Sequence, residues 1–259
     1  MLLGDSYTFG IGCNDGDEFA SVLADDLSED FNIINTGSNG WGLTQQIRVF
    51  YEFGQLYYPK FVVILFSNND PNDNLKDNCT RIEDGRFVFE NFNSGDNFSL
   101  YRLNKSLSQS VIQKSHLYNA LTKIVWSSIK KSQVHKTEKD VQKVNQSNPD
   151  KVDIKEKLYI ELLTLFANDL YEKETKLIFI SVNRLSDNGI YSEVDKFPYI
   201  KDSLLELDSL GILDYININK WFEKEDMVKS PVGHYGERWN SVFGNHLAEY
   251  IKNTTTLNH

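Results

Sequence analysis

The sequence predicts an α/β fold built around a parallel sheet. Segments typical of strands alternate along the chain with segments typical of helices, as in sheets whose parallel strands are joined by crossover helices. Residues 61–66 and 176–182 are continuous apolar runs, as expected of central strands covered on both faces. The 259 residues, 40% hydrophobic and 25% charged, are enough to bury a full core. This composition excludes a collagen-like chain, a disulfide scaffold and a wholly disordered chain.

The first expected strand covers only residues 1–3, because Gly4 follows at once. A buried strand usually has about 5 residues. Either this strand is very short or the chain begins inside a longer natural one, and we favour the second interpretation. No basic stretch followed by an apolar core marks a signal peptide. Missing residues could include an export signal, so the localisation is unknown and both cytoplasmic and exported stay open.

An apolar stripe at Phe19, Val22, Leu23 and Leu27 predicts a helix over residues 17–27. The other expected elements are, in order, a strand at 31–34, a helix at 45–53, the strand at 61–66, strands at 176–182 and 212–218, and a final amphipathic helix within 234–252.

Two stretches interrupt the alternation. Residues 72–104 are polar and turn-rich, with one hairpin-like piece at 84–89, and residues 130–157 almost lack large apolar side chains. The second stretch fits a solvated helix, a mobile flap or disorder. We expect a single domain, 1–259, with insertions at about 72–104 and 130–157. Because function concentrates in loops on a rigid scaffold, we expect substrate specificity or partner contacts in these two stretches.

The charge balance bears on the partners. With 27 Lys and Arg against 37 Asp and Glu, the net charge is −10. Nucleic-acid binding needs clustered positive charge, so no nucleic-acid partner is expected, and docking on anionic lipid is disfavoured. The longest apolar run, at about 61–66, is too short to span a bilayer. The oligomeric state is not readable from the sequence.

The cysteine and histidine pattern predicts neither a metal nor a cofactor. Cys13 and Cys79 are more readily explained as two thiols than as a disulfide, although the sequence does not exclude pairing. No Gly-Lys-Ser/Thr follows the glycines near Ser6, so no phosphate loop is expected. Four histidines show no metal-ligand spacing with one another or with the cysteines: His116, His135, His246 and His259.

Four polar segments each follow an expected strand, and the last of them also opens the final helix. They are Gly4-Asp5-Ser6, the run from Asn35 to Gly40, Ser67-Asn68-Asn69-Asp70, and Gly233-His234-Tyr235. Ligands in open parallel sheets bind at the carboxyl ends of the strands. A serine, a glycine N–H, an asparagine amide and a histidine would therefore meet at one edge. Acyl transfer needs these parts: a nucleophile, oxyanion donors and a general base.

In order and context, these four segments resemble the SGNH (GDSL-type) hydrolase family, and the match covers most of the chain. The family usually has Gly-x-Asn-Asp in its third block, where Ser67 here replaces the glycine. The resemblance implies a three-layer α/β/α, flavodoxin-like fold. It implies that Ser6 is the nucleophile and His234 the base. It implies an oxyanion hole made of the Ser6 and Gly40 backbone N–H groups and the Asn69 side chain.

One departure from the family concerns the carboxylate that orients the histidine. The family's aspartate lies two or three residues before the histidine, where this chain has Val232 and Pro231. An orienting carboxylate holds the imidazole tautomer and stabilises the imidazolium. Asp226, Asp214 or a backbone carbonyl could take this place. A Ser–His dyad and a degenerate enzyme both stay open.

The expected function is a serine esterase that hydrolyses small acyl esters, with acetyl esters on a carbohydrate favoured. Trp41 and Tyr235 flank the expected site and are candidates for a sugar-binding cleft. Asp70 is expected to brace its own turn. The alternatives are an O-acetyltransferase acting on a glycan and a non-catalytic binding module.

Overall fold

The computed structural model describes residues 1–28, 30–76, 79–89 and 153–256. The chain divides into two compact units, one formed by Met1–Asp77 with Lys155–His259 and the other by Asn78–Ile154. The larger unit carries the parallel sheet and all four motif segments.

The central sheet has four parallel strands in the order β1-β2-β5-β8. Their bounds are Leu2–Gly4, Phe61–Phe66, Lys176–Ser181 and Asp214–Ile216. Across the sheet, Leu2 lies opposite Val63, which lies opposite Ile178. The parallel α/β sheet expected from the sequence is therefore confirmed.

A fifth extended segment, residues 34–38, lies along the outer edge of β1. The Leu2 N–H donates to Ile34 O at 2.8 Å, and the Thr36 N–H donates to Leu2 O at 3.0 Å. When the five extended segments are numbered along the chain, with this segment as the second, their order across the sheet is 2-1-3-4-5. This is the flavodoxin-like order.

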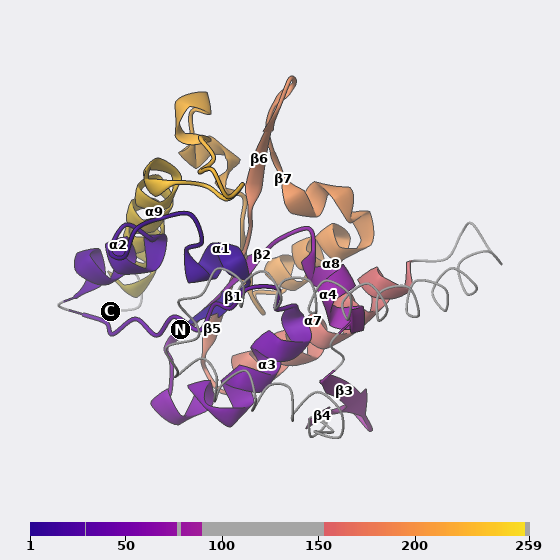
Figure 1. The fold of residues 1–259 in the computed structure, drawn as a ribbon. Helices are drawn as coiled ribbons and strands as arrows, with labels where there is room; N and C mark the ends of the chain where they lie inside the picture. The colour runs from indigo at the N-terminus through magenta and orange to yellow at the C-terminus, as the bar shows by residue number, and fades with distance from the viewer. Residues whose placement is uncertain (29, 77–78, 90–152, 257–259) are drawn as a thin grey trace, which may run out of the picture. The chain divides into compact units, whose positions relative to one another are not determined.

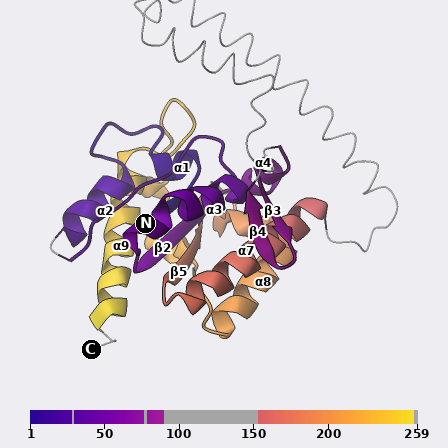
Figure 2. The same ribbon diagram turned by 90° about the horizontal axis from the view of Figure 1, so that it is seen from below.

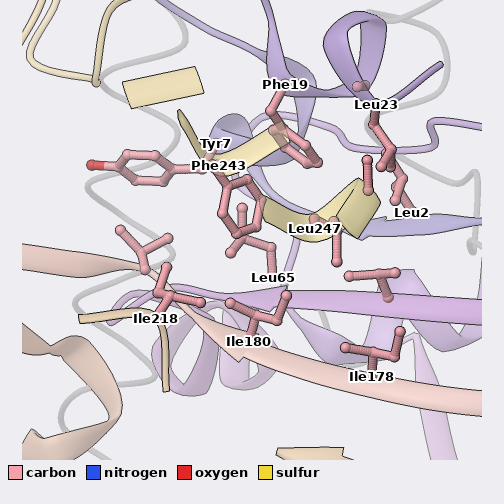
Figure 3. Packing of buried hydrophobic residues seen from close by; sticks show 14 of the residues in the cluster. Leu2, Tyr7, Phe19, Leu23, Leu65, Ile178, Ile180, Ile218, Phe243 and Leu247 are labelled. Atoms are coloured by element: carbon pink, nitrogen blue, oxygen red, sulfur yellow. The ribbon is translucent and has the colours of Figure 1, made fainter. Parts of the chain in front are cut away.

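Helices cover both faces of this sheet (Figures 1 and 2). On one face, α2 (Phe19–Leu27) and α9 (Glu237–Thr256) pack against the strands. Figure 3 shows the layer in which Phe19, Leu23 and Phe243 face the strand residues Leu65 and Ile180. Each such side chain stabilises the fold by about 1.5–3 kcal/mol when fully buried.

Alternate strand residues point to the other face. There, Phe66 contacts Tyr159 of α7 (Ile154–Glu172), with ring centroids 5.3 Å apart. Phe50 of α3 (Leu43–Glu52) contacts Phe166 of α7, with ring centroids 5.1 Å apart. Because both faces are buried, β2 has no polar side chain, which explains its continuous apolar run. The three-layer α/β/α arrangement implied by the family resemblance is thus confirmed.

Other expected elements differ from the structure in detail. The strand at 61–66 has the expected bounds, but the strand expected at 212–218 is only Asp214–Ile216. No regular strand forms at 31–34. The apolar side chains there, Phe31 and Ile33, pack against the core, and pairing begins at 34. The apolar pattern of this segment reflects packing, not strand pairing.

The expected interruptions also need correction. Residues 72–76, assigned to a turn-rich stretch, belong to the helix α4 (Asp70–Lys76). Residues 154–157, assigned to a polar stretch, begin α7. The remaining parts of these stretches, 90–104 and 130–152, lie outside the described residues.

In the smaller unit, the structure describes a hairpin of β3 (Thr80–Glu83) and β4 (Arg86–Phe89). The turn residues Asp84 and Gly85 have φ angles of 49° and 71°. Such Asp-Gly turns suit tight hairpins, so the hairpin-like piece expected at 84–89 is confirmed.

The sequence did not indicate a second hairpin or the helix that follows it. Strands β6 (Asn183–Ser186) and β7 (Gly189–Ser192) form this hairpin directly after β5, and it extends away from the sheet (Figure 1). A short 3-10 turn, η3 (Glu193–Lys196), and the helix α8 (Pro198–Ser209) come next.

Two sequence questions concern disulfides and membranes. No disulfide joins Cys13 and Cys79. Within the part of the chain that the structure describes, no helix combines the length and the apolar character needed to cross a bilayer.

Candidate active site

Ser6 is placed by a tight strand-to-helix connection at the carboxyl end of β1. It begins the short helix α1 (Ser6–Phe9), which Asp5 caps by accepting the Tyr7 N–H at 2.9 Å. A Cβ atom on Gly4 would lie 2.0 Å from Thr8 Oγ1, so only glycine fits between strand and helix. The Gly-Asp-Ser segment thus follows local geometry: glycine for close packing, aspartate for the cap, and serine at the first helical position.

The structure brings His234 to Ser6. His234 Nε2 lies 2.8 Å from Ser6 Oγ, and the serine is only 7% exposed. A turn before α9 holds the histidine: the Ser230 N–H donates to His234 O at 2.7 Å, and the Gly233 N–H donates to Ser230 O at 2.9 Å. A serine hydroxyl and an imidazole nitrogen at this distance can exchange a proton.

No carboxylate faces the other imidazole nitrogen. His234 Nδ1 is buried and has no hydrogen-bond partner among the described residues. Asp226 instead accepts hydrogen bonds from the Glu223 N–H at 2.8 Å and from Arg238 Nε at 2.6 Å, which lower its pKa. Asp214 pairs with Lys176 at 2.9 Å and with the Tyr250 hydroxyl. Of the alternatives left open by the sequence, neither Asp226 nor Asp214 nor a described backbone carbonyl accepts from His234 Nδ1.

Tyr7 packs on the imidazole. The ring centroids of Tyr7 and His234 lie 4.8 Å apart, with the rings tilted by 45°. This contact restricts the orientation of the imidazole without a hydrogen bond to Nδ1.

Neither the Ser6 N–H group nor the Gly40 N–H group has a hydrogen-bond acceptor among the described residues. The Ser6 N–H, as the first of its helix, has no intrahelical acceptor, and no hydrogen bond from it or from the Gly40 N–H occurs among the described residues. Gly40 has a φ of 76°, in the left-handed region that favours glycine, with open space where a Cβ would be. The preceding segment is tied to β1, since the Ser38 N–H donates to Gly4 O at 3.2 Å.

Asn69 lies in the loop after β2, next to the carboxylate that neighbours Ser6. Its Nδ2 donates hydrogen bonds to Asp73 Oδ2 at 2.7 Å and to Asp5 Oδ2 at 3.3 Å. Its Oδ1 accepts from the Ser67 hydroxyl at 2.5 Å. The amide is therefore held from both ends, with its NH2 group donating to two carboxylates and its oxygen accepting from Ser67.

Ser67 and Asp70 form the buried floor of this loop. The Ser67 hydroxyl lies 2.7 Å from Asp5 Oδ2, and the Ser67 N–H donates to Asp70 Oδ2 at 3.2 Å. Burial, together with the nearby Asp5 charge, raises the pKa of Asp70 well above its usual range. As expected from the sequence, Asp70 braces its own turn.

The two aromatic residues expected beside the site differ in their exposure. Tyr235 is 2% exposed, and its hydroxyl donates to Asn183 O at 2.9 Å, so it is a core residue and not a cleft wall. Trp41, directly after Gly40, is partly exposed.

Two charged residues of the site were missed by the sequence analysis. Arg184 of β6 donates from Nε to Glu193, whose side chain is fully buried. Burial lowers the pKa of Arg184, but the charge and hydrogen bond of Glu193, together with Tyr7 and Tyr235, outweigh burial and raise the pKa. No sequence signal identified these residues, because the hairpin and the η3 turn that carry them have no motif and charged residues are usually exposed.

A metal centre is not found in the described part of the chain. No group of three or more His, Cys, Asp or Glu side chains there could hold a metal ion. His246 stacks on Trp221, with ring centroids 5.2 Å apart. His116, His135 and His259 lie outside the described residues.

Comparison with known proteins gives a structural likeness only. No protein-family model and no curated protein matches this sequence. A solved structure of a protein assigned to the G-D-S-L family of lipolytic proteins, from Desulfitobacterium hafniense DCB-2, aligns over 96% of both chains with a TM-score of 0.50 and 9% identity. LAE5, an alpha/beta hydrolase enzyme from the metagenome of Lake Arreo, Spain, aligns over 94% of this chain and 90% of its own, with a TM-score of 0.49 and 10% identity. The first likeness, with the observed layers and strand order, assigns an SGNH/GDSL-like fold to this chain.

Proposed function

We propose that the protein is a serine esterase that hydrolyses small acyl esters through a Ser–His acyl-enzyme mechanism. The observation that carries the proposal is the 2.8 Å separation of Ser6 Oγ and His234 Nε2 at the carboxyl edge of the sheet. The Ser6 and Gly40 N–H groups, which have no acceptor among the described residues, support it, because acyl transfer requires donors for a developing oxyanion.

In the acylation step, Ser6 Oγ attacks the ester carbonyl carbon while His234 Nε2 takes the hydroxyl proton. The carbonyl oxygen becomes an oxyanion that accepts hydrogen bonds from the Ser6 and Gly40 N–H groups and from Asn69 Nδ2, which gives up its 3.3 Å hydrogen bond to Asp5 in this step. When the tetrahedral intermediate collapses, the bond to the alcohol oxygen breaks, and the alcohol leaves with the proton from His234. The acyl group remains on Ser6.

Deacylation repeats these steps with water. His234 takes a proton from water, the resulting hydroxide attacks the acyl carbon, and the acid leaves as the proton returns to Ser6. This catalysis uses a dyad, because no described carboxylate accepts from His234 Nδ1. The loss of the orienting carboxylate in a serine protease lowers kcat about 10⁴-fold, so the rate should be well below that of a full triad.

We favour acetyl esters carried by a carbohydrate as substrates. The partly exposed Trp41, next to Gly40, supports this choice, since aromatic faces offer an apolar surface for sugar rings. Tyr235 gives no such support, because it is buried.

The test is hydrolysis of p-nitrophenyl esters of increasing acyl length by the wild type, Ser6→Ala, His234→Ala and the control His246→Gln. We expect turnover of the acetyl ester by the wild type and the control and loss of turnover in the other two variants. Activity that survives Ser6→Ala would contradict the proposal.

The same assay with added glycans separates the alternatives. Acyl transfer to an added sugar in preference to water would favour an O-acetyltransferase. Complete inertness toward every acyl donor, with the fold intact, would favour a binding module.

A further inference from the structure

The buried ion pair between Arg184 and Glu193 lies where the motif segments meet. Glu193 is 0% exposed and the Arg184 side chain 17%. One Glu193 carboxylate oxygen accepts from Arg184 Nε, and the other accepts the Asn68 N–H at 2.9 Å. The Glu193 N–H donates to Val182 O at 2.9 Å, which fixes the start of η3 to the end of β5.

Arg184 contacts aromatic rings at two further motif segments, those of Ser6 and His234. Its guanidinium carbon lies 5.0 Å from the centroid of the Tyr7 ring and 5.6 Å from that of Tyr235. Both distances are within the range of cation–π attraction. Tyr7 in turn packs on the imidazole of His234, with ring centroids 4.8 Å apart.

The three contacts share one feature: each falls on the chain neighbour of a proposed site residue. Tyr7 follows Ser6, Tyr235 follows His234, and Asn68 precedes Asn69. The ion pair thus ties together three segments that are remote in sequence.

A buried ion pair is a poor way to gain stability, because an apolar pair of similar volume often serves as well or better. The directional bonds of Glu193 and the contacts of the Arg184 guanidinium with two aromatic rings do, however, fix positions that an apolar pair would leave free. Since no described residue accepts from His234 Nδ1, the site depends on such indirect support.

We propose that Arg184 and Glu193 form a positioning pair that sets Ser6, Asn69 and His234 in register for the reaction. This inference rests on the proposed esterase function. Neither residue touches the reacting atoms. They act through Tyr7, Tyr235 and Asn68.

The test compares the wild type with the double variant Arg184→Met/Glu193→Leu, which replaces the charges by apolar side chains and avoids leaving one buried charge alone. Arg184→Lys keeps the charge but loses the planar guanidinium group that lies over the Tyr7 and Tyr235 rings. Lys201→Met is the matched control, because it removes the exposed pair with Asp195 in the same η3 turn.

We expect the double variant to keep a melting temperature near that of the wild type but to lose about 10- to 100-fold in kcat, with KM within about twofold, since small misplacements of reacting groups are costly. The kcat of Arg184→Lys should lie between those of the wild type and the double variant, and the kcat of Lys201→Met should match that of the wild type. An unchanged kcat, or a change confined to KM, would overturn the proposal.

A readout without substrate separates this inference from the proposed function. In the double variant, hydrogen exchange at the Asn68 amide should quicken at least 10-fold and the side-chain amide resonances of Asn69 should shift, while Lys201→Met leaves both unchanged. Unaltered exchange and resonances would overturn the positioning role even if no ester proved to be a substrate. Altered values with an inert wild type would instead count against the esterase alone.

Discussion

His234 Nε2 lies 2.8 Å from Ser6 Oγ, although 228 positions separate the two residues in the chain. The parallel sheet makes this contact possible. Ser6 follows the first strand directly, and the turn before the last helix brings the histidine to the same edge. The imidazole is held by this turn and by the Tyr7 ring, while its buried Nδ1 atom has no acceptor in the part of the chain that the structure describes.

Supplying the missing carboxylate should increase activity. Pro231 is exposed and stands three residues before His234. In Pro231→Asp, a carboxylate that accepts from Nδ1 would favour the catalytic tautomer and stabilise the imidazolium. We expect kcat to rise at least about 10-fold, measured with p-nitrophenyl acetate. Pro231→Asn is the control for the turn itself, and an equal gain in both variants would show that the charge is not the cause.

Gly40→Ala should impair the reaction more than the fold. Its φ of 76° strains an L-residue by about 1–2 kcal/mol. Gly211→Ala is a matched control, because Gly211 has a φ of 69° and both positions have open space for a Cβ. Both variants should lose similar free energy of unfolding in urea, but only Gly40→Ala should lose kcat, since its N–H would move. Equal kcat values would remove Gly40 from the oxyanion hole.

Asn69→Ala should lower kcat by about 10²–10³-fold, the usual effect of deleting one oxyanion donor. KM should change little, because this hydrogen bond strengthens only in the transition state. Asn72→Ala, an exposed asparagine in the same segment, should behave as the wild type. A loss in Asn69→Ala that appears only in KM would indicate substrate binding instead.

Asp70→Asn should change how stability depends on pH. Burial and the Asp5 charge raise the pKa of Asp70 in the folded state above its ordinary value of 3.8. An acid whose pKa is raised on folding stabilises the folded state below pH about 4. This stabilisation is lost as the pH rises through the folded-state pKa. The wild type should therefore lose up to about 1.4 kcal/mol per pH unit in this window from Asp70 alone.

Asparagine cannot ionise, so Asp70→Asn should remove that part of the slope and gain stability relative to the wild type toward pH 8. Urea unfolding between pH 4 and 8 checks this prediction. Asp187→Asn, which removes an exposed carboxylate, is the control. Parallel pH profiles for the wild type and Asp70→Asn would contradict the account.

The sequence located the elements whose local pattern matches their final environment. The continuous apolar run of β2 could belong only to a strand covered on both faces, and its bounds are as expected. The strand expected at 31–34 was wrong. Phe31 and Ile33 pack against the core, whereas the hydrogen bonds to β1 begin at Ile34 and continue through the polar residues that follow.

Residues of the candidate site could be predicted from the sequence only where they belong to a motif segment. Ser6 and His234 could be named from their motif segments, and the structure places them in contact. Asp226 was considered for its nearness in sequence, but Arg238 binds its carboxylate. Arg184 and Glu193 were not found, because the hairpin between them is what brings the two side chains together, and the sequence did not indicate that hairpin.

The most direct measurement of the central claim is covalent labelling of the folded protein by a fluorophosphonate, followed by peptide mass spectrometry. Ser6 Oγ should attack phosphorus and displace fluoride, giving one label on the peptide that contains Ser6. The label should disappear in Ser6→Ala and form much more slowly in His234→Ala. A folded wild type that stays unlabelled at Ser6, or is labelled at another residue, would contradict the assignment of Ser6 as the nucleophile.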